Sequence, residues 1–230
     1  MFDIVTVTVN YKMRDKIMAM LRSLFRDLDG SALKVQSVIV DNASGDGIRE
    51  ALRTEFGDRV VFVDAGANVG FGRGNNLALK KFDAKYYFIA NPDLVLLENQ
   101  PRTIERLYQF MEAHHKVGIV APRLILPSGA TQPSCMRFPR FIDQPAYRLG
   151  LHKKYDFARR RVEHLHMKEF DHTKTQPIDW ATGAALFVRG QWFKEVGFFD
   201  ERYFMYFDDT DLCRIFWSRG WPVYYKGDIV

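Results

Sequence analysis

The stretch VQSVIVDNAS, residues 35–44, decides the fold class. Its first part, Val35 to Val40, is mostly β-branched and apolar, which predicts a short buried strand. The polar turn Asp41-Asn42-Ala43-Ser44 follows where that strand ends. Upstream, apolar residues recur at three-to-four spacing from Ile17 to Leu28 and Gly30 follows them, which predicts a helix and its stop.

The same alternation continues outward from this stretch. We expect further strands at Ile4 to Val9, Val60 to Val63, Tyr86 to Ala90 and Val117 to Val120, and further helices at Ile48 to Phe56, through Leu77 and Leu79, and at Thr103 to His114. Strands that alternate with helices at this interval predict an α/β fold, with a mostly parallel central sheet and helices on both faces. Such sheets bind ligands at the carboxyl ends of their strands. Those ends carry Asn10-Tyr11, Asp41, Asn68 and Asn91-Pro92-Asp93, which predicts one nucleotide-sized crevice.

The pattern changes after Pro122. A basic segment without a clear period follows, and order returns with a predicted strand at Ile178 to Val188. A helix is expected from Asp208 through Arg219, closed by Gly220, and a last strand at Val223 to Tyr225. We therefore expect a single domain over residues 1–230, with an insertion at 123–177.

Composition excludes several classes of protein. The chain has 230 residues, 47% of them hydrophobic and 27% charged, which argues against disorder and against a coiled coil. Its two cysteines, Cys135 and Cys213, argue against a disulfide scaffold or a Cys-rich zinc module and favour a cytoplasmic setting. No apolar run approaches the roughly 20 residues that span a bilayer. We expect a soluble protein or one bound peripherally to the inner face of the cell membrane.

Positive charge is concentrated in one segment. The net charge is +5, and residues 137–174 hold ten Lys and Arg against five acidic residues, so the rest of the chain is balanced. Four of the six histidines lie in the same segment. This distribution favours an anionic partner.

Asp41 is a candidate ligand-binding residue because a carboxylate at the end of a buried strand needs a donor. A pyrimidine N3–H is such a donor. Capping of the next helix, or a turn closed with Ser44, explains the same residue equally well.

Two further motifs are compatible with a bound nucleotide. The turn Asn91-Pro92-Asp93 offers Asp93 to a divalent cation on a diphosphate, since Mg²⁺ and Mn²⁺ commonly use one or two protein carboxylates plus phosphate oxygens. In isolation the tripeptide is better explained as a plain turn. The glycines between Gly66 and Gly74 allow close approach of the backbone to a ligand, although they lack dinucleotide-loop spacing.

A group of acidic residues, Asp208, Asp209 and Asp211, opens the last predicted helix. Capping accounts for some acidic charge at a helix start. Three acidic residues in four exceed that need, and two neighbouring carboxylates raise the pKa of one of them and prepare it as a base. The aromatic run 203–207 would form an apolar wall beside them.

In combination, these motifs resemble the inverting family-2 glycosyltransferases with the GT-A fold, particularly the bacterial rhamnosyltransferase-like branch. The matching pieces occur in the family's order at residues 9–11, 41–44, 68–72, 91–93, 180–184 and 197–212. The resemblance implies transfer of a sugar, L-rhamnose being one candidate, from a dTDP-sugar or UDP-sugar to a glycan or a polyprenyl-diphosphate-linked acceptor.

The resemblance also implies a role for each site residue. Nucleotide binding falls to Tyr11, Asp41, Asn68, Gly70, Asn91 and Asp93, with Asp93 on Mg²⁺ or Mn²⁺. The donor sugar lies beside Trp180, Thr182, Gly183 and Ala184. Asp209 is the catalytic base and Asp208 its neighbour. Residues 1–122 then form the nucleotide-binding half and 178–230 the acceptor and catalytic half.

Three features depart from the family pattern. Asp208 replaces the usual Glu, and Asn91 stands where many relatives have Asp. The chain stops at Val230, whereas relatives commonly continue past this point, so we expect an incomplete acceptor site.

The basic segment 137–174 suggests a partner of its own. We expect Lys153, Lys154 and Arg159 to Arg161 to contact anionic lipid headgroups or the carrier's diphosphate. A solvated loop is the alternative.

Three other functions compete with this interpretation. A nucleotidyltransferase would need a glycine-rich phosphate loop after the first strand, where the chain has Asn10-Tyr11-Lys12-Met13. A nucleic-acid-binding module would need a recognisable motif, and none is present, so we expect no nucleic-acid partner. A nucleotide-sugar-binding protein without turnover is the third alternative.

Overall fold

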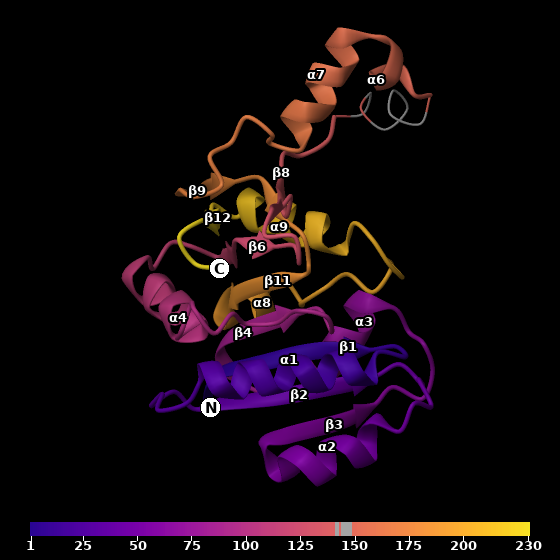
Figure 1. The fold of residues 1–230 in the computed structure, drawn as a ribbon, viewed down its shortest axis with the longest axis vertical. Coiled ribbons are helices and arrows are strands. Elements are labelled where there is room, and N and C mark those ends of the chain that lie inside the picture. The colour runs from indigo at the N-terminus through magenta and orange to yellow at the C-terminus, as the bar shows by residue number, and fades with distance from the viewer. Residues whose placement is uncertain (141–142, 144–148) are drawn as a thin grey trace.

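The computed structural model describes residues 1–140, 143 and 149–230. Eight strands form the central sheet in the order β3-β2-β1-β4-β11-β5-β12-β9 (Figure 1). Six run in one direction, while β11 and β9 run antiparallel to them. The strands of this sheet are β1 Phe2–Asn10, β2 Val35–Asp41, β3 Val60–Asp64, β4 Ala84–Ala90, β5 Ile119–Pro122, β9 Thr175–Ile178, β11 Ala185–Arg189 and β12 Val223–Lys226.

Helices cover both faces of the sheet, as predicted. The covering helices are α1 Arg14–Asp27, α2 Ile48–Phe56, α3 Phe71–Leu79, α4 Thr103–Ala113, α8 Gly190–Glu195 and α9 Asp208–Ser218, with a short 3-10 turn η1 at Gly57–Arg59. Two further helices, α6 Leu151–Lys154 and α7 Asp156–Leu165, stand away from the sheet (Figure 1). One apolar layer contains Ile17 of α1, Leu52 of α2 and Leu107 of α4. The other contains Leu79 of α3 and residues of α8 and α9. The sheet is therefore buried between two helical layers.

The predicted strand at Ile178 to Val188 is wrong, because the chain breaks there into three pieces. Residues 175–178 form edge strand β9, Trp180–Ala181 form β10, which pairs with β8 (Cys135–Met136), and β11 enters the centre of the sheet between β4 and β5. Between β10 and β11, the Thr182 N–H donates to the Ser134 carbonyl and the Gly183 N–H to the Asp209 carboxylate. These bonds turn the backbone out of the ladder.

Residues 123–177 contain more regular structure than their sequence pattern predicts. They form the hairpin β6 (Leu124–Ile125) and β7 (Thr131–Gln132), strand β8, helices α6 and α7, and strand β9. Apolar periodicity could not predict helix α7, because Ala158 is its one buried residue. Arg148, counted among the cations of this segment, lies outside the described residues. None of the described helices is both long enough and apolar enough to cross a membrane.

A buried amide joins α3 to the segment before α9. Asn76 Nδ2 donates to the Phe199 carbonyl at 2.9 Å, and Asn76 Oδ1 accepts the Phe199 N–H at 3.1 Å. The Glu201 carboxylate accepts a further bond from the same amide. Asn76 therefore fixes the start of the segment that leads to the acidic helix terminus.

We expect Asn76→Ala to lower the free energy of unfolding by about 1–3 kcal/mol, because it leaves buried backbone groups of Phe199 without partners. Urea unfolding measures this loss. Asn99→Ala is the matched control, since Asn99 is exposed and its side chain makes no hydrogen bond among the described residues; it should change stability by less than about 0.5 kcal/mol. Equal effects of the two substitutions would contradict the role given to Asn76.

Candidate functional site

The first predicted site residue, Asp41, lies at the carboxyl end of β2 beside Asn10 of β1, its partner in the parallel register. Its buried carboxylate accepts a bond from Asn10 Nδ2 at 2.8 Å and one from the Ser44 N–H at 3.2 Å. Asn10 also donates to Asp46, a residue that no sequence motif singled out. The turn with Ser44 that competed with ligand binding is therefore present.

Asn68 belongs to a second turn at the same edge. Its Oδ1 accepts the Gly70 N–H and a bond from Asn42 Nδ2, each at 3.1 Å, and Asn42 also donates to the Gly70 carbonyl. Asn42 thus connects the turn after β2 to the turn before α3. Tyr11, close to Asn10 at this edge, is about half exposed.

Gly70 is required by the protein's own backbone. It has a φ of +86°, and a Cβ placed on it would lie 2.1 Å from the Phe204 carbonyl oxygen. That carbonyl accepts the Phe71 N–H at 3.0 Å. The sequence predicted that the glycines of this segment let a ligand approach the backbone closely; at Gly70 the group that approaches is the Phe204 carbonyl. It holds the aromatic loop 203–207 against the start of α3.

Beyond this contact lies a cavity of about 730 Å³. Its walls come from the turn after β4, the start of α3, the region of β7 to β10, the end of α7, the loop 203–207 and the start of α9. Among the predicted site residues it is lined by Asn91, Trp180, Thr182, Gly183, Ala184, Asp208 and Asp209. Tyr11, Asp41, Asn68, Gly70 and Asp93 do not line it. The predicted residues therefore form two groups. The contact between Gly70 and Phe204 lies next to the cavity, because Phe71 and Met205, which follow these two residues in the chain, both line it.

The two carboxylates at the start of α9 have different surroundings. Asp209 is well satisfied: its Oδ2 accepts the Gly183 N–H at 2.9 Å and its Oδ1 accepts the Thr210 N–H at 2.7 Å. Asp208 is buried beside Gly72, and its Oδ2 has no hydrogen-bond partner among the described residues. Burial, and after it the charge of Asp209, raises the pKa of Asp208 to about 6. Burial also raises the pKa of Asp209.

Asp93 lies two residues after Asn91, whose N–H donates to the Ala184 carbonyl. The Asp93 side chain is 55% exposed, and its nearest cation is Lys16 Nζ at 3.8 Å. Within the described part of the chain, no group of three His, Cys, Asp or Glu side chains could hold a metal ion. Asp93 therefore fits an ion that takes most of its ligands from a bound diphosphate, and it does not belong to an all-protein metal site.

Several cavity residues were not predicted. Arg137 and His166 come from the basic segment, which the sequence assigned to an anionic partner or to a solvated loop, and burial lowers the pKa of His166. Met205, Tyr206 and Phe207 also line the cavity, but they belong to the aromatic run 203–207 that the sequence did predict as an apolar wall beside the acidic residues. Only the tertiary fold could show that the basic segment reaches this cavity.

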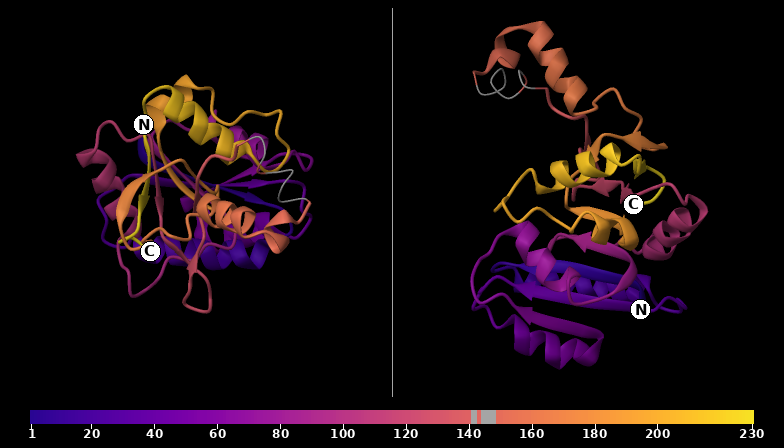
Figure 2. Two further views of the ribbon diagram at one scale, coloured as in Figure 1. Left: turned by 90° about the horizontal axis from the view of Figure 1, so that it is seen from above. Right: turned by 180° about the vertical axis from the view of Figure 1, so that it is seen from behind.

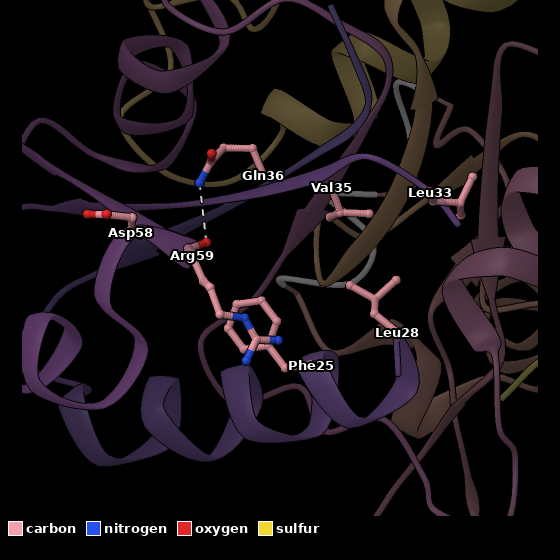
Figure 3. A pocket seen from close by; sticks show the side chains of 7 residues that line it. All are labelled: Phe25, Leu28, Leu33, Val35, Gln36, Asp58 and Arg59. Carbon is pink, nitrogen blue, oxygen red and sulfur yellow. Dashed lines mark hydrogen bonds between the residues drawn. The ribbon is translucent and has the colours of Figure 1, made fainter. Parts of the chain in front are cut away.

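Another cavity, of about 430 Å³, lies beside the amino ends of β2 and β3 (Figure 3). The Arg59 guanidinium lies 3.8 Å from the centre of the Phe25 ring there, and Gln36 Nε2 donates to the Arg59 carbonyl. Residues 33–36 and 58–59 precede or begin β2 and β3. Ligands of such sheets bind at the carboxyl ends of the strands, so the cavity lined by Asp208 and Asp209 is the better candidate for the functional site.

Comparison with known proteins identifies the family. The family described as Glycosyl transferase family 2 matches residues 3–177, more than half of the chain. The chain belongs to glycosyl transferase family 2. The matched segment contains the carboxyl-edge residues from Tyr11 to Asp93 and ends before Thr182 and the Asp208-Asp209 pair.

Two curated relatives extend the comparison. The chain is 29% identical over 200 residues to N-acetylglucosaminyl-diphospho-decaprenol L-rhamnosyltransferase of Mycobacterium tuberculosis, covering 81% of this chain and 62% of the relative. It is 23% identical over 220 residues to the low-salt glycan biosynthesis hexosyltransferase Agl10 of Haloferax volcanii, covering 92% of this chain and 60% of the relative. The chain thus spans about three fifths of the length of these relatives.

Solved structures confirm the GT-A fold. The mannosyltransferase PcManGT of Pyrobaculum calidifontis, in complex with GDP-Man and Mn²⁺, superposes with a TM-score of 0.64 at 17% identity, over 96% of this chain and 54% of that one. TarS of S. aureus superposes with a TM-score of 0.64 at 15% identity, over 97% and 60% of the two chains. The expected fold class is therefore confirmed.

We expect Gly70→Ala to destabilise the fold by at least about 2 kcal/mol, because the new Cβ meets the Phe204 carbonyl in a backbone conformation that L side chains rarely adopt. Thermal and urea unfolding measure the loss. Gly66→Ala is the control: Gly66 has a φ of +71°, and no atom lies within 4 Å of the point where its Cβ would stand, so it should cost about 1 kcal/mol. Equal losses would show that the contact with Phe204 adds nothing.

The pKa of Asp208 predicts a pH-dependent stability. Because its pKa is raised on folding, the folded state binds this proton more tightly than the unfolded state, and stability falls as pH rises from about 4 through about 6. Asp208→Asn removes this dependence. Relative to the variant, the wild type should lose on the order of 1–3 kcal/mol between about pH 4.5 and about pH 7.5 in urea unfolding. A difference that stays constant with pH would contradict the assignment.

Proposed function

We propose that the chain transfers a sugar from a nucleoside-diphosphate sugar to a hydroxyl of a glycan or polyprenyl-diphosphate-linked acceptor, with inversion at the anomeric carbon. The observation that supports this most is the Asp208-Asp209 pair in the wall of the cavity, where Asp209 accepts a hydrogen bond from the Gly183 N–H of the Thr182 to Ala184 turn. L-rhamnose is the first candidate sugar, because the M. tuberculosis relative is an L-rhamnosyltransferase.

Asp209 is proposed as the base. Its bonds from the Gly183 and Thr210 N–H groups fix the direction of its carboxylate. In the reaction the acceptor oxygen attacks the anomeric carbon and gives its proton to Asp209, while the bond from that carbon to the diphosphate oxygen breaks and its electron pair leaves with the nucleoside diphosphate. One displacement inverts the configuration.

The donor is proposed to extend from the carboxyl edge of the sheet into the cavity. Its base would lie at Tyr11 and Asp41, its nucleoside beside Asn68 and Gly70, and its sugar beside Trp180 and Thr182 to Ala184. The position of Asn91 supports this path, since Asn91 lines the cavity and directly follows β4 at the same edge as Asp41.

Asp93 is proposed to hold Mg²⁺ or Mn²⁺ against the donor diphosphate, with Asn91 beside it. The exposure of its carboxylate supports this role. When bound, such an ion neutralises charge on the leaving diphosphate. The donor nucleotide is proposed to be dTDP or UDP.

The acceptor is proposed to enter along the aromatic loop. Met205, Tyr206 and Phe207 are exposed to solvent and also line the cavity next to Asp209. Exposed aromatic rings offer apolar faces to sugar rings or to a lipid-linked acceptor. A lipid-linked acceptor would bring the enzyme to the inner face of the cell membrane.

We expect Asp209→Asn to lower kcat at least about a hundredfold while leaving donor binding nearly unchanged, because Asn keeps an oxygen for the Gly183 N–H but cannot accept the proton. Release of nucleoside diphosphate from dTDP-rhamnose and UDP-hexoses measures turnover. Thermal shifts with dTDP and UDP, each with and without Mn²⁺, measure binding.

Asp93→Asn is the companion variant. It should abolish the part of the thermal shift that depends on Mn²⁺ while leaving the unliganded melting temperature unchanged. Near-normal transfer by Asp209→Asn would show that the assigned base is wrong. Nucleotide binding without turnover in the wild type would favour a binding protein, and release of pyrophosphate from a nucleoside triphosphate would favour a nucleotidyltransferase.

A further inference from the structure

Helices α6 and α7, with Leu149 and Tyr155, form an arm that stands clear of the sheet and its helical layers (Figures 1 and 2). Its base is attached to the candidate site. The Arg137 N–H donates to the Leu165 carbonyl at the end of α7, and Leu165 and His166 line the cavity that holds Asp209. A surface that binds the arm would therefore also fix the orientation of the cavity relative to that surface.

The arm exposes large apolar side chains. Leu149 is 72% exposed, Phe157 71% and Tyr155 52%. The rings of Tyr155 and Phe157 lie 5.8 Å apart, so they form one patch. Exposed apolar side chains that cluster in this way indicate a binding surface.

Exposed cations flank this patch in the sequence. Lys153, Lys154 and Arg160 are exposed, and none of them makes an ion pair within the described residues. By contrast, Arg159 pairs with Asp156 at 3.0 Å and Arg161 with Asp143 at 2.8 Å. Between Leu149 and Arg160 the described residues hold four cations and one acidic side chain. The patch therefore combines apolar rings with uncompensated positive charge.

We propose that the arm docks on an anionic membrane surface, with Tyr155, Phe157 and Leu149 at the level of the headgroups and Lys153, Lys154 and Arg160 on the lipid phosphates. Aromatic and aliphatic side chains flanked by Lys and Arg are typical of interfacial binding elements. Leu149 favours a lipid over a nucleic acid, because an aliphatic side chain has no ring on which a base can stack. The proposal deepens the proposed function by naming a partner surface, but transfer is not needed to test it.

The test is co-sedimentation of the wild-type chain with vesicles of phosphatidylglycerol and phosphatidylcholine in equal amounts, and with vesicles of phosphatidylcholine alone, at low and high salt. We expect binding to the anionic vesicles that weakens with salt. The variant Lys153→Gln/Lys154→Gln/Arg160→Gln should lower the partition coefficient about a hundredfold, since each cation contributes about fivefold. Phe157→Ser should lower it at both salt concentrations.

The control Lys34→Gln/Arg53→Gln/Lys81→Gln removes the same charge from exposed sites in the first half of the chain and should leave most binding intact. Circular dichroism and melting temperature verify that both triple variants fold. Asp209→Asn should bind vesicles like the wild type, so a failure of docking is distinguishable from a failure of the proposed catalysis. Absence of vesicle binding, equal loss in both triple variants, or preferential binding of the arm to RNA would each overturn the proposal.

Discussion

The contact between the Phe204 carbonyl and the backbone at Gly70 and Phe71 holds the two halves of the candidate site together. One side belongs to the turn that follows β3 and receives hydrogen bonds from Asn42; the other leads within four residues to Asp208. Because no side chain fits at residue 70, the aromatic loop can approach until main chain meets main chain. Asn76 makes a second connection between the same two segments through Phe199. Contacts with the first half of the chain therefore hold the acidic start of α9 in position.

The acidic pair shows how neighbouring carboxylates acquire different properties. Burial raises the pKa of both carboxylates, but Asp209 accepts several hydrogen bonds that fix the direction of its carboxylate, whereas Asp208 has one oxygen unpartnered among the described residues. The first environment holds a carboxylate in a fixed direction, and the second favours the protonated acid. A catalytic base needs the first property, which is why Asp209 carries that role in the proposal.

Much of the fold could be predicted because its signals are local. The apolar runs before Asn10, Asp41 and Asn91 mark strands, and the acidic cluster at residue 208 marks a helix start. The break at Thr182-Gly183 could not be predicted, since a small, apolar segment has the composition of a strand and the group that turns it, Asp209, lies 26 residues away. That Leu165 and His166 of the basic segment line the cavity could not be predicted either, because the segment has no clear period and its charge indicated only an anionic partner or a solvated loop. The polar residues at strand ends could be recognised from the sequence, whereas their hydrogen-bond partners could be known only from the tertiary structure.

The position of β11 also has a consequence for how the chain folds. This strand occupies the centre of the sheet, yet its first residue, Ala185, pairs with Ala90, 95 residues earlier. During synthesis the four strands from β1 to β4 can assemble early, leaving the β4 edge without its neighbour until β11 emerges from the ribosome. An open, apolar strand edge is prone to pair with other chains. Nascent chains that stop before residue 185 would thus be the aggregation-prone species, and chaperone capture at this stage would protect the growing polypeptide.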